Sequence, residues 1–300
     1  QAFDILDQLK AKKISVRSWL ILAITAILSA LVKYAFLPIL AAIAIILAGM
    51  VLKTYGRDMK GLWRAVKTDF LAQPVWAKVL LPALLLLSLG MFAQRDIVNF
   101  VNYHSVVPDC SRVLNVHDCK AYSPWYTDYI RHMHVLDGKH RASKNMLQYT
   151  HEWFYWMWYR LFFAVNGLSS HFANYPPLIL PARAAEIIAV AGGAALVLWR
   201  KRVFRDNPYM LLLLTVTLIY VVALFAKGYA TYKHTAVLEN MNGRYLLPVL
   251  LPMAAMFGAG LSFALKGYAR TKAAMAVLAV VLLLQGGGVL TFMVRSDETW

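Results

Sequence analysis

Apolar residues gather into seven segments, separated by stretches that are richer in polar and basic residues. Their lengths approach the roughly 20 residues that a helix needs to cross the hydrocarbon core of a membrane. Lysines and arginines beside the shorter segments can reach the lipid surface, so these segments can also span. The pattern predicts an all-α polytopic bundle with spans at 18–33, 36–53, 79–94, 184–199, 209–226, 246–265 and 274–293.

Two further segments, 2–16 and 56–75, carry apolar residues at helical spacing on one face. In the second segment this face holds Met59, Leu62, Trp63, Val66 and Phe70, and the other face holds Arg57, Lys60, Arg64 and Lys67. Such a pattern favours an amphipathic helix that lies on anionic lipid. A connecting helix with a solvated basic face is the alternative.

The composition supports a membrane protein. Hydrophobic residues make up 60% of the chain, charged residues make up 15%, and the mean hydropathy is +0.54. An average soluble domain has about 25% charged residues. One soluble core cannot bury this much apolar surface, and the chain has too little polarity to stay disordered in water.

The net charge of +16 is explained by membrane orientation, because basic residues collect on the cytoplasmic side. Of the 31 lysines and arginines, 17 lie before the first span or after the second, fourth and sixth spans. The positive-inside rule then places residue 1 in the cytoplasm, and segment 95–183 and the C-terminus outside. The expected location is a bacterial inner membrane, with membrane lipids as partners. The basic residues form no nucleic-acid-binding motif, so we expect no nucleic acid.

This topology divides the chain into three parts. Residues 1–94 hold the amphipathic segments and three spans, residues 95–183 form the extracytoplasmic segment, and residues 184–300 hold four spans. The first residue is Gln rather than Met. We therefore expect that the start was processed away or that the chain begins inside a longer product.

Cys110 and Cys119 both fall in the predicted outer segment. Because that side of the membrane can be oxidising, the natural interpretation is a disulfide that closes a short loop. Free thiols, or a metal site completed by the nearby His104 and His117, are the alternatives. The spacing matches no recognised zinc pattern, and we assign no metal ligand.

Other polar clusters in the outer segment have a plain structural interpretation. His132, His134 and His140 favour a wet loop over a metal or proton-transfer site. The aromatic run 151–160 predicts an interfacial helix, with a carbohydrate-stacking surface as the alternative. Arg183 and Glu186 are three residues apart and should pair on one helical face.

The predicted outer loop 227–245 contains the strongest candidates for ligand-binding residues. An arginine and a tyrosine, Arg244 and Tyr245, stand at the mouth of the sixth predicted span. Arginine suits bidentate binding of phosphate at such a boundary, and an interfacial anchor is the alternative. The further binding candidates in this loop are Lys233, His234, Glu239 and Asn242.

The Gly-Arg-Tyr-Leu-Leu-Pro stretch at 243–248 resembles the one before a late helix in GT-C-type membrane glycosyltransferases and in related bacterial DUF2142 proteins. Upstream, Arg95-Asp96, Asn99, Pro108-Asp109-Cys110, Cys119, Tyr122, Pro124-Trp125, the 153–160 helix and Asn166-Gly167 extend the likeness, which covers about 79–265. The resemblance implies an extracytoplasmic site for a polyprenyl-phosphate-linked sugar. Arg244 and Tyr245 would hold the donor phosphate.

One departure concerns the catalytic carboxylate, which these enzymes carry in the first outer loop. Here that loop is the 33–38 turn, which has no Asp or Glu. Either the catalytic part lies upstream, or the protein is a non-catalytic relative, or Asp109, Asp118 or Asp128 substitutes. No cofactor is indicated firmly, and a divalent metal is an option if the chain is a glycosyltransferase. The alternative functions are a non-catalytic subunit that binds membrane protein partners and a lipid or solute transporter.

Overall fold

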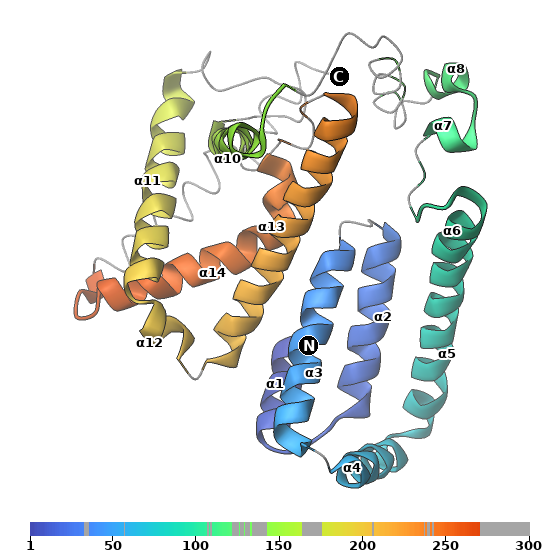
Figure 1. The fold of residues 1–300 in the computed structure, drawn as a ribbon. Coiled ribbons are helices and arrows are strands. Elements are labelled where there is room, and N and C mark those ends of the chain that lie inside the picture. The colour runs from blue at the N-terminus through green and yellow to red at the C-terminus, as the bar shows by residue number, and fades with distance from the viewer. Residues whose placement is uncertain are drawn as a thin grey trace. The chain divides into compact units, whose positions relative to one another are not determined.

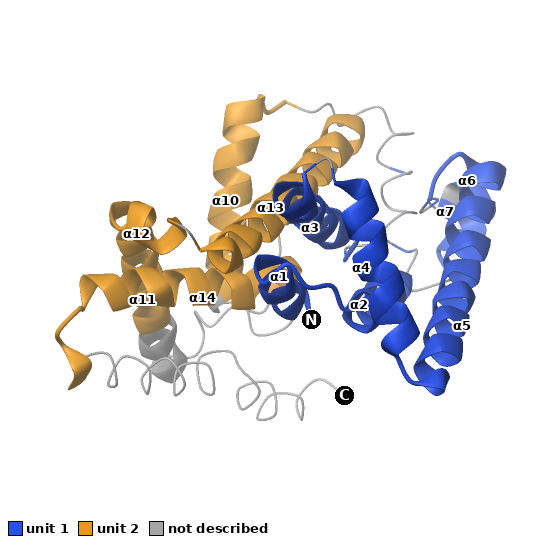
Figure 2. Cartoon of the chain, turned by 90° about the horizontal axis from the view of Figure 1, so that it is seen from below, with its two compact units in different colours: residues 1–141 blue, residues 142–300 orange. Residues whose placement is uncertain are grey.

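The structure is a computed structural model of the 300-residue chain. It describes residues 1–32, 36–56, 58–106, 108, 110–121, 126, 129, 133, 143–163, 176–205, 207–236, 238, 241 and 243–270. Every regular element within these residues is helical, as the sequence predicts. The chain forms two compact units, Gln1–Arg141 and Ala142–Trp300 (Figure 2). The predicted division into three parts by membrane side stays a prediction.

In the first unit the second helix packs against the fifth, and the first helix packs against the third (Figure 1). Ile24 packs against Ala77 and Leu81, which joins the second helix to the fifth. The first helix buries Leu6 and Leu9, as its predicted amphipathic pattern requires. These helices are α1 (Ala2–Lys10), α2 (Val16–Val32), α3 (Leu37–Tyr55), α4 (Met59–Ala72) and α5 (Val75–Phe92).

The third predicted span is longer than the sequence indicated. Helix α5 continues through a π-helical segment, η2 (Ala93–Ile97), into α6 (Val98–Tyr103). No glycine or proline interrupts this stretch after position 90, so the charged residues at 95 and 96 do not end the helix. It ends at His104, which adopts a left-handed conformation with φ of 51°. Two short helices follow, α7 (Cys110–Val113) and α8 (Val116–Cys119).

The second unit is built on close helix packing at glycines. A Cβ added at Gly260 would lie 2.8 Å from the Cα of Leu196, so the two backbones approach directly. A Cβ at Gly192 would meet Phe257 in the same interface. Small residues allow this close approach between membrane helices. The elements are α10 (Met146–Phe163), α11 (Pro176–Leu198), α12 (Arg200–Phe204), α13 (Pro208–Thr235), η5 (Gly243–Leu246) and α14 (Leu247–Ala264).

Four helical stretches among the described residues are long and apolar enough to cross a membrane: Leu37–Tyr55, Val75–Tyr103, Pro208–Thr235 and Leu247–Ala264. The predicted first span is the shorter apolar helix Val16–Val32. Helix α11 covers the predicted fourth span, and the predicted seventh span, 274–293, lies outside the described residues. A membrane protein with an all-helical fold is therefore supported, and the number of seven spans stays a prediction.

Candidate functional site

The Gly-Arg-Tyr segment is folded against the aromatic helix of the second unit. Residues 243–246 form the single 3-10 turn η5, which leads directly into α14. A Cβ at Gly243 would lie 2.8 Å from the carbonyl carbon of Arg160 and closer still to the backbone of Leu161. Only glycine fits this contact without a shift of backbone. The turn that carries Arg244 is therefore fixed to α10.

Two hydrogen bonds hold the ends of this turn. The guanidinium of Arg160 donates from Nη1 to the carbonyl oxygen of Met241 at 3.2 Å, and it lies 4.9 Å from the ring centre of Trp156. The hydroxyl of the buried Tyr220 on α13 donates to the carbonyl oxygen of Tyr245 at 2.6 Å. The backbone of the turn is thus attached to both α10 and α13.

The face of α10 that meets α13 is an aromatic cluster. Tyr149 lies 5.6 Å from Phe225, 5.1 Å from Tyr229 and 5.2 Å from Tyr232 between ring centres, and Trp153 lies 5.4 Å from Phe225. Trp153 is 1% exposed, and its indole nitrogen has no hydrogen-bond partner in the described part of the chain. The aromatic run therefore forms a helix, as predicted, and it buries Trp153 in internal packing.

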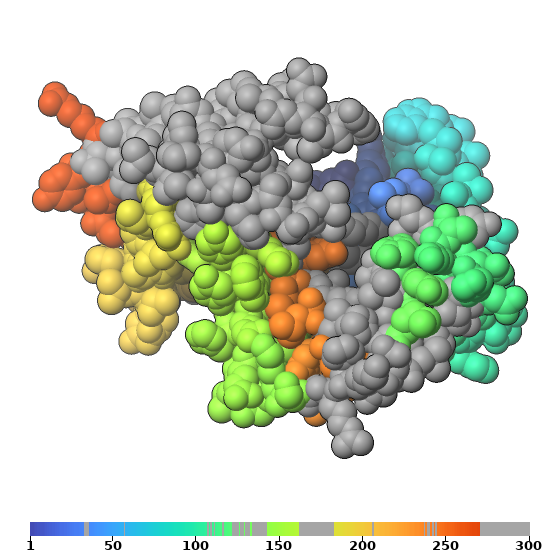
Figure 3. All heavy atoms as spheres, turned by 90° about the horizontal axis from the view of Figure 1, so that it is seen from above, coloured from blue at the N-terminus to red at the C-terminus, as the bar shows by residue number. Residues whose placement is uncertain are grey.

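The opposite face of α10 is open. Phe154 and Tyr155 are exposed, and the ring of Tyr155 stacks on that of Tyr159 with 6.0 Å between centres. Figure 3 shows α10 on the surface of the unit, between α11 and α13. At the start of the helix the Lys144 ammonium pairs with Glu152, and the Lys144 amide donates to the Tyr232 hydroxyl at 2.8 Å.

The predicted binding residues described near this turn lie on two elements, η5 and α13. Tyr245 is half-buried in η5. Lys233 and His234 are exposed on the last turns of α13, which continues to Thr235 instead of ending at 226. The predicted loop is shorter for that reason, since residues 227–235 contain no proline and their one glycine is tolerated. Glu239, Asn242 and the side chain of Arg244 lie outside the described residues.

The predicted pairing of Arg183 with Glu186 is confirmed. The guanidinium Nη1 lies 2.6 Å from Glu186 Oε2. The other carboxylate oxygen of Glu186 accepts a hydrogen bond of 2.8 Å from the indole N–H of Trp158. Glu186 therefore joins α11 to α10 and holds the side of the aromatic helix next to the open face.

The disulfide between Cys110 and Cys119 is also confirmed, with 5.9 Å between the two Cα atoms. Because both sulfur atoms are oxidised, they cannot act as thiolate ligands with His104 and His117. Among the described residues, no three His, Cys, Asp or Glu side chains lie close enough to hold a metal ion. The His132, His134 and His140 group lies outside the described residues.

Of the three predicted catalytic carboxylates, one lies within the described residues. Asp118 is exposed on α8, and Asp109 and Asp128 lie outside the described residues. A carboxylate that our sequence reasoning did not select, Asp96, is only 8% exposed at the end of the α5 span. It lies in the π-helical segment η2, a local distortion that often accompanies functional sites. The neighbouring Arg95 turns away and donates to the carbonyl oxygen of Leu31.

Asp96 makes no hydrogen bond or ion pair with any residue that the structure describes. An acidic residue within a membrane-spanning helix is a functional candidate by default, because its charge is costly at membrane depth. The signal in the sequence was a charged Arg-Asp pair within an otherwise apolar stretch. What the sequence could not indicate was that the helix continues past this pair and buries the acid.

Comparison of the chain with family models, with curated proteins and with solved structures finds no match. The assignment of a function therefore depends on the chemistry of these residues.

Proposed function

We propose that the chain is a glycosyltransferase-like protein of the bacterial inner membrane, with its N-terminus in the cytoplasm. It binds a polyprenyl-phosphate-linked sugar at the extracytoplasmic ends of its helices. The side assignment depends on the distribution of lysine and arginine, 17 of 31 of which lie on the predicted cytoplasmic side. In that topology, the end of α5 and the start of α14 face the same aqueous compartment.

The observation that carries the proposal is the fixed turn at Gly243–Leu246. The Gly243 contact, Arg160 and Tyr220 hold the backbone around this turn, so the backbone that carries Arg244 is preorganised. Preorganisation lowers the entropy lost when a ligand binds. A guanidinium at the membrane boundary can make two parallel hydrogen bonds to a phosphate whose lipid tail stays in the bilayer.

The open face of α10 is suited to the rest of such a ligand. The rings of Phe154 and Tyr155 are exposed on α10, the helix that holds the turn. Aromatic faces can stack on the apolar face of a sugar or pack against an isoprenoid chain. The exposed cations Lys233 and His234 at the end of α13 add positive potential on the same predicted side.

Transfer of the sugar needs a carboxylate that accepts a proton. In the proposed transfer, the acceptor hydroxyl oxygen forms a bond to the anomeric carbon while the bond from that carbon to the phosphate oxygen breaks. The hydroxyl proton passes to the carboxylate, and polyprenyl phosphate leaves with the electron pair of the broken bond. The second experiment compares two carboxylate candidates in the described part of the chain: Asp96, which is 8% exposed, and Asp118, which is exposed on α8.

The first experiment measures binding of undecaprenyl phosphate to the purified chain in lipid nanodiscs. Arg244→Ala should weaken binding by about tenfold or more, because a charge-assisted hydrogen bond contributes on the order of 1.5–3 kcal/mol. Lys266→Ala removes one exposed positive charge from the predicted cytoplasmic side and should leave the affinity unchanged. Equal affinity of wild type and Arg244→Ala would refute the phosphate site.

The second experiment separates binding from catalysis. The chain is supplied with a panel of polyprenyl-phosphate sugars, and released undecaprenyl phosphate is measured. Asp96→Asn should abolish release and leave undecaprenyl phosphate binding intact, while Asp118→Asn should retain release. If the wild type binds the lipid phosphate but transfers none of the sugars, the protein is a binding relative without the catalytic activity.

A further inference from the structure

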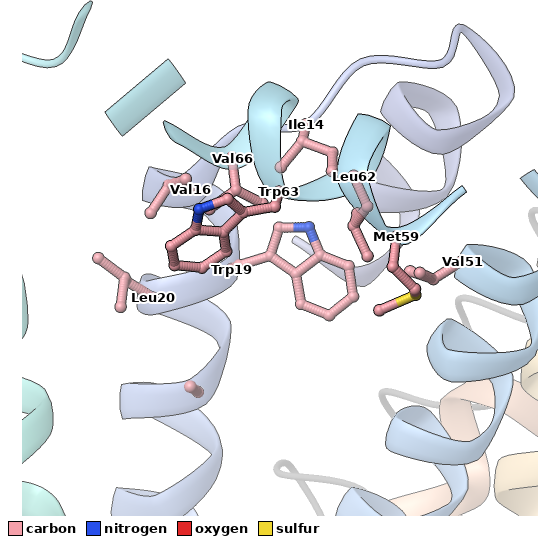
Figure 4. Close-up of a pocket in the computed structure, with 10 residues that line it drawn as sticks. Ile14, Val16, Trp19, Leu20, Val51, Met59, Leu62, Trp63 and Val66 are labelled. Carbon is pink, nitrogen blue, oxygen red and sulfur yellow. The ribbon is translucent and has the colours of Figure 1, made fainter. Parts of the chain in front are cut away.

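An apolar groove of about 460 Å³ lies in the first unit, at the end of the helices where α4 crosses α2 and α3 (Figure 4). Its walls include Val16 and Trp19 of α2, Val51 of α3, and Met59, Leu62 and Trp63 of α4. All ten lining residues are apolar. Ligand sites in proteins commonly have volumes of about 300–1,000 Å³, so the groove is large enough for part of a small molecule.

The position of α4 keeps the groove open. The Asp69 carboxylate of α4 accepts a hydrogen bond of 2.7 Å from the amide of Val16, at the start of α2. This bond fixes one end of α4, while the helix buries none of its residues. Trp63 is 69% exposed and Met59 is 60% exposed. Large apolar side chains of this kind require a covering that the first unit itself does not supply.

Exposed cations stand next in sequence to residues that line this groove. On α4 they are Lys60, Arg64 and Lys67, at spacings of three and four residues that place them on one side of the helix. On α2, Arg17 is exposed, and its guanidinium lies 5.3 Å from the ring centre of Trp76. The acidic residues of α4 are already engaged, since Asp58 caps its first turn and Asp69 binds Val16. These four cations outnumber Asp58 and Asp69, whose carboxylates keep their negative charge, so the rim of the groove carries a net positive charge.

We infer that the groove binds one acyl chain of an anionic phospholipid, whose phosphate faces the α4 cations. The apolar lining matches a hydrocarbon chain, and the charge of the rim matches an anionic headgroup. The predicted topology places this end of the helices in the cytoplasmic leaflet, where anionic lipids attract basic segments. A bound lipid would cover Trp63 and Met59 and hold α4 against the bundle. The site is separate from the proposed phosphate-sugar site and does not depend on it.

Quenching of tryptophan fluorescence by brominated acyl chains tests this inference on the full chain in vesicles. Phosphatidylglycerol or phosphatidylcholine carries the bromines, at equal mole fraction in the same total lipid mixture. The signal of Trp63 is the difference between wild type and Trp63→Phe. Brominated phosphatidylglycerol should quench Trp63 with about fivefold higher apparent affinity for each engaged cation, relative to brominated phosphatidylcholine.

Two triple variants distinguish a specific lipid-binding site from general electrostatic attraction to the membrane. Lys60→Gln/Arg64→Gln/Lys67→Gln should remove the preference for phosphatidylglycerol and keep the weaker quenching by phosphatidylcholine. Arg200→Gln/Lys201→Gln/Arg202→Gln removes the same number of exposed charges from α12 and should leave the preference intact. Equal quenching by both lipids in the wild type, loss of the preference in both triple variants, or no quenching of Trp63 would overturn the inference.

Discussion

Gly243 lies directly against the backbone of Leu161, so the start of η5 and the end of α10 share a contact that admits no side chain. The two residues are far apart in the sequence, and the contact places the Gly-Arg-Tyr turn on the aromatic helix. A glycine that permits close approach is a structural requirement here, independent of its backbone conformation. The proposed phosphate site depends on this contact for its position.

We expect Gly243→Ala to destabilise the second unit by about 1–3 kcal/mol, because an added methyl group forces two backbone segments apart. Thermal unfolding in mild detergent, followed by tryptophan fluorescence, measures the change. Gly258→Ala is the matched control in α14, where a Cβ meets nothing within 4 Å. Alanine should be tolerated there or stabilise the helix slightly. Equal unfolding temperatures for the two variants would show that the Gly243 contact does not limit stability.

Glu186 accepts from Trp158 with one oxygen and pairs with Arg183 through the other. Glu186→Gln keeps a hydrogen-bond acceptor for the indole, whereas Glu186→Leu removes it. We expect Glu186→Leu to cost about 1–3 kcal/mol more than Glu186→Gln, since a part-buried donor loses its partner. The Arg183 pair is more than half exposed on the arginine side and should contribute little. Equal unfolding temperatures for these two variants would contradict the role of the Trp158 bond.

The elements predicted well from sequence are those that long apolar runs determine. Helices α2 and α3 fall within a few residues of their predicted spans, and the disulfide and the helix at 151–160 followed from local spacing. Boundaries were less accurate where polar residues follow an apolar run. Arg95 and Lys233 looked like residues beyond a span, but both lie inside continuous helix.

The candidate site could be predicted only in part, because its geometry depends on contacts between distant segments. The sequence singled out Arg244 and Tyr245, but not the support from Arg160 and Tyr220 on two other helices. The burial of Asp96 depends on the packing of helix neighbours rather than on its own sequence context. Local patterns carry no information about such long-range contacts.

The disulfide makes a prediction about thiol content. Denatured, unreduced protein should show no reactive thiol in an Ellman titration, and reduction should release two, because both cysteines of the chain are paired. Cys110→Ser/Cys119→Ser should lower the stability of this loop by about 2–3 kcal/mol in a chain-entropy estimate for about ten residues. Two titratable thiols before reduction, in protein exported under oxidising conditions, would contradict the pairing.

The Asp69–Val16 hydrogen bond makes a prediction about the position of α4. Asp69→Ala should leave the first amide of α2 without its acceptor and cost about 1 kcal/mol, in the range of a lost helix cap. It should also make Trp63 more accessible to a water-soluble quencher such as iodide, because α4 loses its attachment to α2. Thr68→Ala, at the exposed neighbouring position, is the control and should change neither property. Unchanged iodide quenching in Asp69→Ala would show that other contacts position α4.

Membrane orientation can be tested with single cysteines in the Cys110→Ser/Cys119→Ser background. Lys12, Lys233 and Lys266 are exposed in the structure, so cysteine at each position can react. The basic-residue distribution predicts that a membrane-impermeant maleimide labels Lys233→Cys in intact cells with an opened outer membrane. Lys12→Cys and Lys266→Cys should react only after the inner membrane is permeabilised, because both lie in basic segments retained in the cytoplasm. The reverse pattern would place the Arg244 turn in the cytoplasm and exclude an extracytoplasmic sugar donor at that site.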